Sequence, residues 1–211
     1  MPLIRSNDYH DFVIKDGEFI GEFEQMYQQV GDPWGCGGQA GVLKNDLLVT
    51  LAGHVGGHKV LDIGCGLGTL TNRLQNALPA AEWYACDISP TAAAKAARDN
   101  PAVHFLALDV CKSDFPFMPG SFDLIIMSEV LWYILPFLDT VLARIRELLS
   151  KDSNFLVMQY FLAPEEQKYG NGIVAGPRDF TMFLERAGFK LEREIFLGAV
   201  PPNDVLFWSR S

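Results

Sequence analysis

The sequence predicts an α/β fold in which a mostly parallel sheet ends in an antiparallel edge. From about residue 58 onward, apolar strand-like runs alternate with helix-like segments, and this alternation implies parallel strands joined by right-handed crossovers. The last two strand-like runs, residues 190–197 and 204–209, have no helix between them, which favours antiparallel pairing. The 211 residues are 49% hydrophobic and 20% charged, which is enough for one substantial core and favours one domain over two.

The charge balance and the distribution of apolar residues exclude several classes of partner. With 17 Lys and Arg against 26 Asp and Glu, the net charge is −9, so the surface repels phosphate backbones and acidic membranes. We therefore expect no nucleic-acid partner and no membrane partner. No apolar run approaches the roughly 20 residues of a membrane span. The first residues show neither an apolar signal core nor an Arg/Ser-rich transit pattern, from which we expect a cytoplasmic location. The oligomeric state stays open.

The first elements of the chain are expected to be two helices joined by a glycine-rich hinge. Apolar side chains recur at helical spacing in residues 17–30, and the turn Gly31-Asp32-Pro33 ends that helix. A second helical pattern covers residues 39–52, after the stretch WGCGGQAG. We expect residues 1–40 to form an N-terminal helix and a lid, with residues 17–38 as its moving part.

The remaining elements alternate along the chain. Strand-like runs lie at residues 59–63, 82–88, 103–110, 122–129 and 154–161, and helices are expected at 68–78, 89–100, 131–149 and 177–187. The helix at 89–100 has a start signal, because Ser89 suits the N-cap and Pro90 suits the first helical position. Residues 163–177 are rich in Gly, Pro and polar groups, and a loop of this length is typical of a lid or binding loop. We expect residues 160–178 to form a substrate loop.

The sharpest motif is HKVLDIGCGLGT, an apolar strand that ends near Asp62 and continues into Gly64, Gly66 and Gly68. Glycines at such a place let the backbone turn tightly and approach a ligand without a Cβ in the way. Taken alone, the three glycines fit an ordinary strand-to-helix turn equally well.

Acidic residues at the ends of the next two strands favour a ligand site over an ordinary turn. Asp87 ends the second strand and Asp109 the third. Each alone is typical of a loop or cap residue, but an acid in the place of Asp87 is typical of ribose binding, so the combination predicts a nucleoside pocket. A dinucleotide loop would need glycine where Thr69 stands, which makes NAD the weaker interpretation.

Together, the strings VLDIGCGLGT, ACDIS, ALDV and FDLIIMSEVLWYI resemble class I S-adenosylmethionine-dependent methyltransferases, from about residue 40 to the end of the chain. This resemblance implies a Rossmann-like fold with a seven-stranded, mostly parallel sheet, an antiparallel last strand and helices on both faces. It also implies one methyltransferase domain over residues 1–211, S-adenosylmethionine as cofactor and S-adenosylhomocysteine as product. The short length, the DPWG segment and the SEVLWYI motif are similar to the rhizobial nodulation-factor N-methyltransferases.

The resemblance also implies roles for individual residues. The cofactor-binding set is expected to be Trp34, Asp62, Gly64, Gly66, Gly68, Asp87, Ile88, Asp109, Val110 and Ser128. In this set the glycines line the cofactor, Asp87 binds the ribose, and Asp109 with Val110 holds the adenine. Ser128 and Glu129 face the sulfonium end. Val110, Ser128 and Glu129 also suit structural roles as core, turn and helix N-terminal residues. Trp34 either packs over the methionine end of the cofactor or anchors its segment to the core.

The expected reaction is methyl transfer to a small polar metabolite, with Glu129 and Tyr133 as catalytic candidates. The rate of such an in-line displacement depends on alignment and on exclusion of water, and a neutral amine needs no strong base. No histidine follows the fourth strand, so an amine acceptor, such as an amino sugar, is favoured over a hydroxyl. No metal is expected, because Glu129 has no acidic partner nearby in the sequence.

Two other interpretations stay open. The chain could be a non-catalytic S-adenosylmethionine-binding sensor or partner domain, because a fold alone does not establish activity. It could also be a small-molecule O-methyltransferase. An aminopropyl transferase is disfavoured, because those enzymes resemble one another in a Gly-Gly-x-Gly loop and an Asp base, whereas this loop reads Gly-Cys-Gly and position 128 is Ser. Trp132 and Tyr160 are expected either as walls of the acceptor site or as core residues.

Overall fold

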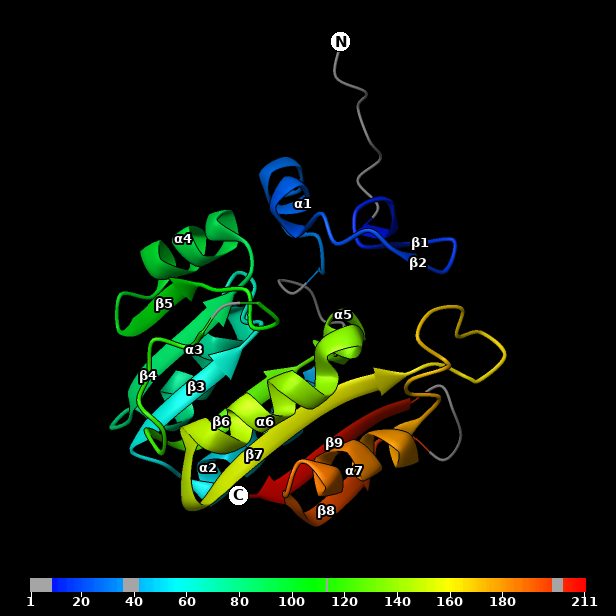
Figure 1. Cartoon of the computed structure of the whole chain (residues 1–211). Helices are drawn as coiled ribbons and strands as arrows, with labels where there is room; N and C mark the ends of the chain where they lie inside the picture. Colours follow the sequence, from blue (N-terminus) through cyan, green and yellow to red (C-terminus); the bar gives the residue numbers. More distant parts are fainter. Residues whose placement is uncertain (1–8, 36–41, 113, 199–202) are drawn as a thin grey trace.

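The centre of the structure is a seven-stranded sheet with the strand order β5-β4-β3-β6-β7-β9-β8 (Figure 1). The structure is a computed structural model and describes residues 9–35, 42–112, 114–198 and 203–211. The strands are β3 (Lys59–Ile63), β4 (Glu82–Asp87), β5 (Val103–Ala107), β6 (Phe122–Ser128), β7 (Leu149–Phe161), β8 (Lys190–Phe196) and β9 (Asn203–Arg210). The predicted seven-stranded α/β sheet is confirmed.

The pairing of the strands places a ligand-binding edge at the end of β3. Strands β3 to β7 run parallel, whereas β9 pairs antiparallel with both β7 and β8, which confirms the antiparallel edge. In register, Ile63 of β3 lies opposite Cys86 of β4 and Met127 of β6. The strand order therefore reverses at β3, and crevices at such switch points are where open α/β sheets bind ligands.

Helices cover both faces of the sheet, as expected. Helices α2 (Val42–Val55) and α3 (Thr69–Ala77) pack on one face, and α6 (Leu138–Leu148) and α7 (Pro177–Arg186) pack on the other. Helix α4 (Pro90–Asp99) lies along β4 and β5. Strand β6 is buried on both sides, since Leu124 and Ile126 join one core while Ile125 and Met127 join the other. This explains why its sequence is a continuous apolar run rather than an alternating one.

The predicted helix over residues 17–30 is wrong in its first part. Helix α1 covers only Phe23–Gln29, and the preceding residues form a hairpin of β1 (Ile14–Lys15) and β2 (Glu18–Phe19). The turn of this hairpin is Asp16-Gly17, with φ values of 53° and 84°. Two positive φ angles match the type I′ turn for which Asp-Gly is a favoured pair, so turn chemistry overrides the helical spacing of the apolar residues.

Other boundaries differ from the predictions for local reasons. The expected helix at 131–149 is divided into α5 (Leu131–Ile134), a 3₁₀ turn (Leu135–Phe137) and α6, because Pro136 has no N–H with which to continue α5. Strand β5 ends at Ala107, so Asp109 lies beyond the strand and not at its last position. Strand β7 begins at Leu149 rather than at 154. The predicted helix start at 39–41 lies outside the described residues, as do residues 1–8 and 36–38 of the expected N-terminal helix and lid.

The N-terminal elements lie over the carboxyl ends of the strands (Figure 1). They form a small core of their own, in which Phe12, Val13, Met26 and Tyr27 are buried together with Ala92 of α4. This core fixes the N-terminal segment to the edge of the sheet where the glycine motif emerges. In the described part of the chain, no helix combines the length and the apolar character that a membrane crossing requires.

Candidate functional site

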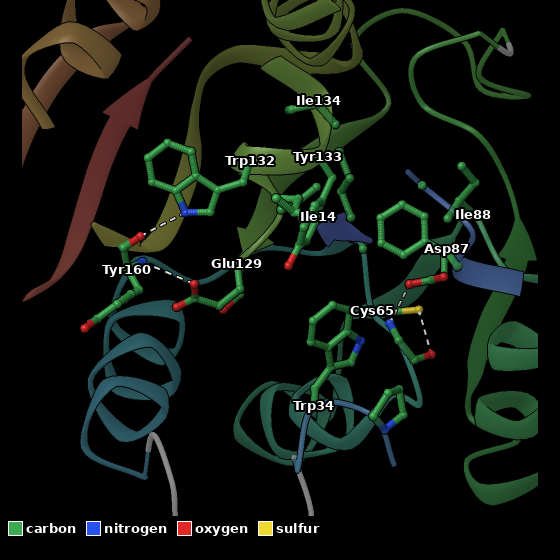
Figure 2. A pocket seen from close by; sticks show the side chains of 18 of the residues that line it. Ile14, Trp34, Cys65, Asp87, Ile88, Glu129, Trp132, Tyr133, Ile134 and Tyr160 are labelled. Atoms are coloured by element: carbon green, nitrogen blue, oxygen red, sulfur yellow. Dashed lines mark hydrogen bonds between the residues drawn. The ribbon is translucent and has the colours of Figure 1, made fainter. Parts of the chain in front are cut away.

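A cavity of about 1320 Å³ lies at the carboxyl ends of β3, β4 and β6, beneath the N-terminal segment. Figure 2 shows two groups of side chains on opposite sides of it, with Tyr133 and Trp34 between them. We call the side with Gly64, Gly66 and Asp87 the glycine end. We call the side with Glu129, Trp132 and Tyr160 the Glu129 end. The cavity is therefore an elongated site with two chemically different ends.

The glycine motif forms the floor of the glycine end. Gly64 has a φ of 76°, and a Cβ there would clash with the side chain of Val130. Gly66 has a φ of 53°, and a Cβ there would lie 2.8 Å from the hydroxyl of Tyr27. Both glycines line the cavity. Gly68 does not: it precedes the first turn of α3 and packs against α4 and β5.

Asp87 ends β4 and ties the glycine motif to the next helix. Its Oδ2 accepts a hydrogen bond from the backbone N–H of Gly66 at 2.8 Å, and its Oδ1 accepts one from the N–H of Ser89 at 2.9 Å. Burial raises the pKa of this carboxyl, and the two backbone donors oppose that shift. Each carboxylate oxygen has a second lone-pair site, so a ligand diol has two acceptors available at the cavity wall.

Asp62 lies deeper, behind the glycine motif. It is 2% exposed and accepts a hydrogen bond of 2.6 Å from the hydroxyl of Thr71 on α3. Burial raises its pKa to about 6, with a further increase from the charge of Asp87 and a decrease from the Thr71 hydroxyl. Asp62 therefore links the end of β3 to α3, and it also lines the cavity.

Ile88, Asp109 and Val110 line the outer part of the glycine end. The side chain of Ile88 is exposed at the cavity wall, beside Asp87 (Figure 2). Asp109 accepts the backbone N–H of Cys111 at 3.0 Å and forms an ion pair with Lys112 at 3.3 Å. The structure thus brings together nine of the ten expected cofactor-binding residues along one cavity, and Gly68 is the exception.

Glu129 follows β6 in a left-handed backbone conformation, with a φ of 60°. Its Oε1 contacts Lys44 Nζ at 2.7 Å, and its Oε2 accepts hydrogen bonds of 3.2 Å from Gln159 Nε2 and from the backbone N–H of Tyr160. Burial raises the pKa of Glu129, and the Lys44 charge opposes this shift. About 35% of its side chain stays accessible, so the carboxylate is anchored on one side and open to the cavity on the other.

Lys44 is a site residue that sequence reasoning missed. It comes from α2 and lies 2.7 Å from Glu129 and 3.0 Å from Asp204, at the start of β9. Burial opposes its charge, but these two carboxylates raise the pKa of Lys44 overall. No local pattern identifies it, because the three residues are brought together only when α2, β6 and β9 assemble.

Aromatic side chains line the middle of the cavity. Tyr133, on α5, lies with its ring centroid 5.2 Å from that of Phe23 and 5.9 Å from that of Trp34. The indole N–H of Trp34 donates to the hydroxyl of Tyr27 at 2.8 Å. At the Glu129 end, the indole of Trp132 donates to the backbone carbonyl of Tyr160 at 3.1 Å. The rings of Phe23 and Trp34 pack against Tyr133 and so connect the N-terminal segment to α5, the helix that follows β6. Ser128, at the end of β6, also lines the cavity.

Glu24 links helix α1 to α4 by hydrogen bonds. It is a second residue that was not identified from the sequence. Its carboxylate accepts hydrogen bonds from the hydroxyls of Ser89 and Thr91 and from the backbone N–H of Thr91, at the N-terminus of α4. Partial burial works to raise its pKa, but these donors outweigh burial and lower the pKa to about 2. Lys95 adds a contact of 3.2 Å to the backbone carbonyl of Tyr27.

The loop at residues 163–177 also borders the cavity. Four of its residues line the cavity, namely Glu166, Gln167, Lys168 and Tyr169. The ring of Tyr169 stacks on Phe19 of the hairpin, with centroids 5.9 Å apart. The hairpin and this loop therefore form one continuous cover.

The charge of the cavity wall is acidic on balance. The lining includes eight Asp or Glu residues and five Lys or Arg residues. Within the described ranges, no group of three or more His, Cys, Asp or Glu side chains has an arrangement that would hold a metal ion. The acidic balance of the wall favours a ligand with a positive or neutral polar group.

Comparison with known sequences finds similarity over parts of the chain. Residues 61–155, a little under half of the chain, match the model of a methyltransferase domain. A curated relative, the ribosomal RNA small subunit methyltransferase C of Salmonella arizonae, is 36% identical over 128 residues, which are 60% of this chain and 34% of the relative. The chain thus spans about a third of the length of that relative.

Comparison with solved structures identifies the same fold. The N-methyltransferase NodS from Bradyrhizobium japonicum WM9, in complex with S-adenosyl-L-homocysteine, superposes with a TM-score of 0.71 at 19% identity, over 85% of this chain and 92% of that one. The [4+2]-cyclase SpnF superposes with a TM-score of 0.69 at 16% identity, over 82% of this chain and 81% of that one. One fold thus carries proteins with differently named activities, so function has to be argued from the residues of the site.

Proposed function

Because the chain has the class I methyltransferase fold, we propose that it is an S-adenosylmethionine-dependent methyltransferase that acts on an amine of a small polar metabolite. The observation that carries this proposal is the cavity at the switch point of the sheet. It joins the glycine end, which includes Asp87, to the Glu129 end, which is lined by Glu129 and aromatic side chains. We further propose that the whole chain is one domain, with residues 1–40 as lid and residues 160–178 as substrate loop.

The residues of the glycine end fit the nucleoside part of the cofactor. Asp87 has free lone-pair sites on both carboxylate oxygens for the two ribose hydroxyls, and the backbone of Gly64 and Gly66 lies open to the cavity. Val110 and Ile88 offer apolar contact to a base next to Asp109. When bound, S-adenosylmethionine would supply an electrophilic methyl group on its sulfonium.

The residues of the Glu129 end fit an amine acceptor. The acceptor nitrogen forms its bond to the methyl carbon while the carbon–sulfur bond breaks and its electron pair stays on sulfur, so the nitrogen must arrive with a free lone pair. Glu129 offers an anchored carboxylate that orients an amine N–H, and the rings of Trp132, Tyr133 and Tyr160 provide walls that favour a cationic or polar group. Release of the proton to water completes the reaction without a dedicated base.

Two features favour a small molecule over RNA as the acceptor, although the curated relative is named for ribosomal RNA. The net charge of −9 and the excess of acidic side chains in the cavity wall oppose a polyphosphate backbone. The hairpin and the 163–177 loop also border the cavity, and Phe19 of the hairpin stacks on Tyr169 of the loop.

The N-terminal segment is proposed to act as a lid over the cofactor, which excludes water during transfer. Trp34 would close over the methionine part, held there by its hydrogen bond to Tyr27 and by the ring of Tyr133. Hydrogen exchange of the amides in residues 23–35 should slow when S-adenosylhomocysteine is added. Unchanged exchange would count against a lid.

The deciding experiment combines calorimetry with a turnover screen. The protein should bind S-adenosylhomocysteine, and it should form this product from S-adenosylmethionine in the presence of amino sugars or other small amines. Hydroxylated metabolites and ribosomal RNA serve as competing acceptor classes. Turnover on hydroxyls alone would make the chain an O-methyltransferase, turnover on RNA alone would overturn the small-molecule assignment, and binding without any turnover would favour the sensor interpretation.

A further inference from the structure

A cluster of charged residues at the Glu129 end joins three distant parts of the chain. Lys44 Nζ lies 2.7 Å from Glu129 Oε1 and 3.0 Å from Asp204 Oδ1. Its ammonium also lies 6.0 Å from the ring centroid of Tyr160. Helix α2, the end of β6 and the start of β9 contribute one charge each. Lys44 and Glu129 both line the cavity, so this cluster is part of its wall and not a remote surface feature.

The carboxylate of Glu129 is held by donors from two directions. From β7, Gln159 Nε2 and the backbone N–H of Tyr160 both donate to Oε2 at 3.2 Å. From α2, Lys44 holds Oε1. The left-handed backbone of Glu129, with a φ of 60°, is one that a non-glycine residue rarely adopts without compensation. The interactions of this carboxylate provide that compensation.

We propose that Lys44 is a positioning residue, whose ammonium orients the Glu129 carboxylate so that its open side faces an acceptor amine. This inference rests on the proposed function and assigns the residue that prepares its acceptor site. Lys44 is suited to this task, since only 19% of its side chain is accessible and its two carboxylate partners limit where the ammonium can lie. The acceptor class that fits is a primary or secondary amine, and a carboxylate at the same place would face Glu129 directly.

Lys44 and Asp204 carry opposite charges, so their removal should shift the pKa of Glu129 in opposite directions. The charged groups that face Glu129 are Lys44 from α2 and Asp204 from β9, and the neighbouring strand β7 contributes Tyr160, whose ring lies beside the Lys44 ammonium. The Lys44 charge lowers the pKa of Glu129, whereas the Asp204 charge raises it. Removal of Lys44 should therefore raise the pKa of Glu129, and removal of the Asp204 charge should lower it.

The test is a carbon-13 NMR titration of the side-chain carboxyl of Glu129 in the full chain. We expect Lys44→Met to raise the pKa of Glu129 by about one unit or more. Asp204→Asn should shift the same pKa in the opposite direction, and Lys44→Arg should keep it near the wild-type value. The amide resonance of Tyr160, which donates to Glu129, should move in Lys44→Met and return in Lys44→Arg. These variants are independent, so Asp204→Asn and Lys44→Arg still test the proposal if Lys44→Met does not fold.

Two further measurements test whether the cluster affects catalysis, and they distinguish a failure of this inference from a failure of the proposed function. With the acceptor found by the turnover screen, the acidic limb of kcat/KM should show, below the ionisation of the acceptor amine, a second break from Glu129 that moves to higher pH in Lys44→Met and not in Lys44→Arg. A Glu129 titration that is the same in all variants would overturn the role of Lys44. Failure of the wild-type protein to bind S-adenosylhomocysteine would overturn the proposed function instead, and it would leave the titration result intact.

Discussion

The hydroxyl of Tyr27 lies against the backbone of Gly66, so close that a Cβ on Gly66 would be only 2.8 Å away from it. Helix α1 therefore rests directly on the glycine motif. The same hydroxyl accepts the indole N–H of Trp34. Gly66 thus serves two purposes, a left-handed turn and a close approach of the N-terminal segment.

The contact between Tyr27 and Gly66 predicts the effect of Gly66→Ala. The new methyl group should push Tyr27 away and loosen α1, in addition to the cost of about 1 kcal/mol for an alanine at positive φ. Gly56→Ala is the matched control, because Gly56 has a φ of 68° and open space around it. Urea unfolding and hydrogen exchange of residues 23–29 measure both effects. Equal exchange in the two variants would show that the contact does not hold α1.

Asp87→Asn should weaken binding of S-adenosylhomocysteine. The amide retains the size of the side chain but loses charge-assisted hydrogen bonds to the ligand. Each such bond contributes about 1.5–3 kcal/mol, so the loss of one should lower the affinity roughly 10-fold to 100-fold. Asp123→Asn is the control, since Asp123 also accepts two backbone N–H groups, those of His58 and Lys59, but does not line the cavity. Calorimetry on both variants decides the matter, and an unchanged affinity in Asp87→Asn would contradict ribose binding.

The docking of α1 should depend on pH through Glu24. Its pKa falls from an ordinary value of 4.5 to about 2 in the folded protein, so the ionised carboxylate stabilises the docked state. This stabilisation is complete above pH 4.5 and is lost as the pH falls through about 2. Protection factors of the amides in residues 23–29 should decrease over this range in the wild type.

Two variants serve as controls for this pH dependence. Glu24→Gln should show lower protection at neutral pH and no change between pH 4.5 and about 2, because its side chain does not titrate. Glu18→Gln, at an exposed position of the hairpin, should behave like the wild type. A pH dependence that survives in Glu24→Gln would assign it to another group.

Tyr133→Phe and Glu129→Gln should separate amine methylation from base-assisted chemistry. For an amine acceptor we expect Tyr133→Phe to lower kcat modestly, because the ring that packs on Phe23 and Trp34 is retained. Loss of a positioned general base typically costs 10²-fold to 10⁴-fold. A fall in kcat of about 10³-fold or more in either variant, with unchanged cofactor affinity, would move the assignment to an O-methyltransferase.

The grouping of the residues at the glycine end of the cavity was predictable because they are local in the sequence. Gly64, Gly66 and Asp87 lie at strand ends, and the ends of parallel strands share one edge of the sheet by construction. Alternation of strands and helices likewise predicts the sheet, since it depends on burial patterns within each short segment. Gly68 shows the limit of such reasoning, because its neighbours Ala96 and Phe105 come from other elements.

The Glu129 end of the cavity was less predictable because its contacts are long-range. Lys44 and Asp204 meet Glu129 only through the packing of α2 and β9 against the sheet, and no spacing rule connects positions so far apart. The hairpin at residues 14–19 was missed for another reason, since the Asp16-Gly17 turn lies at the start of the run with helical spacing, and Gly17 is itself the first residue of that run.

The stacking of Phe19 on Tyr169 has a consequence for the order of events in a catalytic cycle. The hairpin that bears Phe19 continues into helix α1, which Glu24 links to α4. One connected segment of the chain therefore lies over both ends of the cavity. Under the proposed function, release of S-adenosylhomocysteine from the glycine end and entry of an acceptor at the Glu129 end would both require this segment to move. Under that proposal, departure of the product and arrival of the next acceptor would be coupled steps.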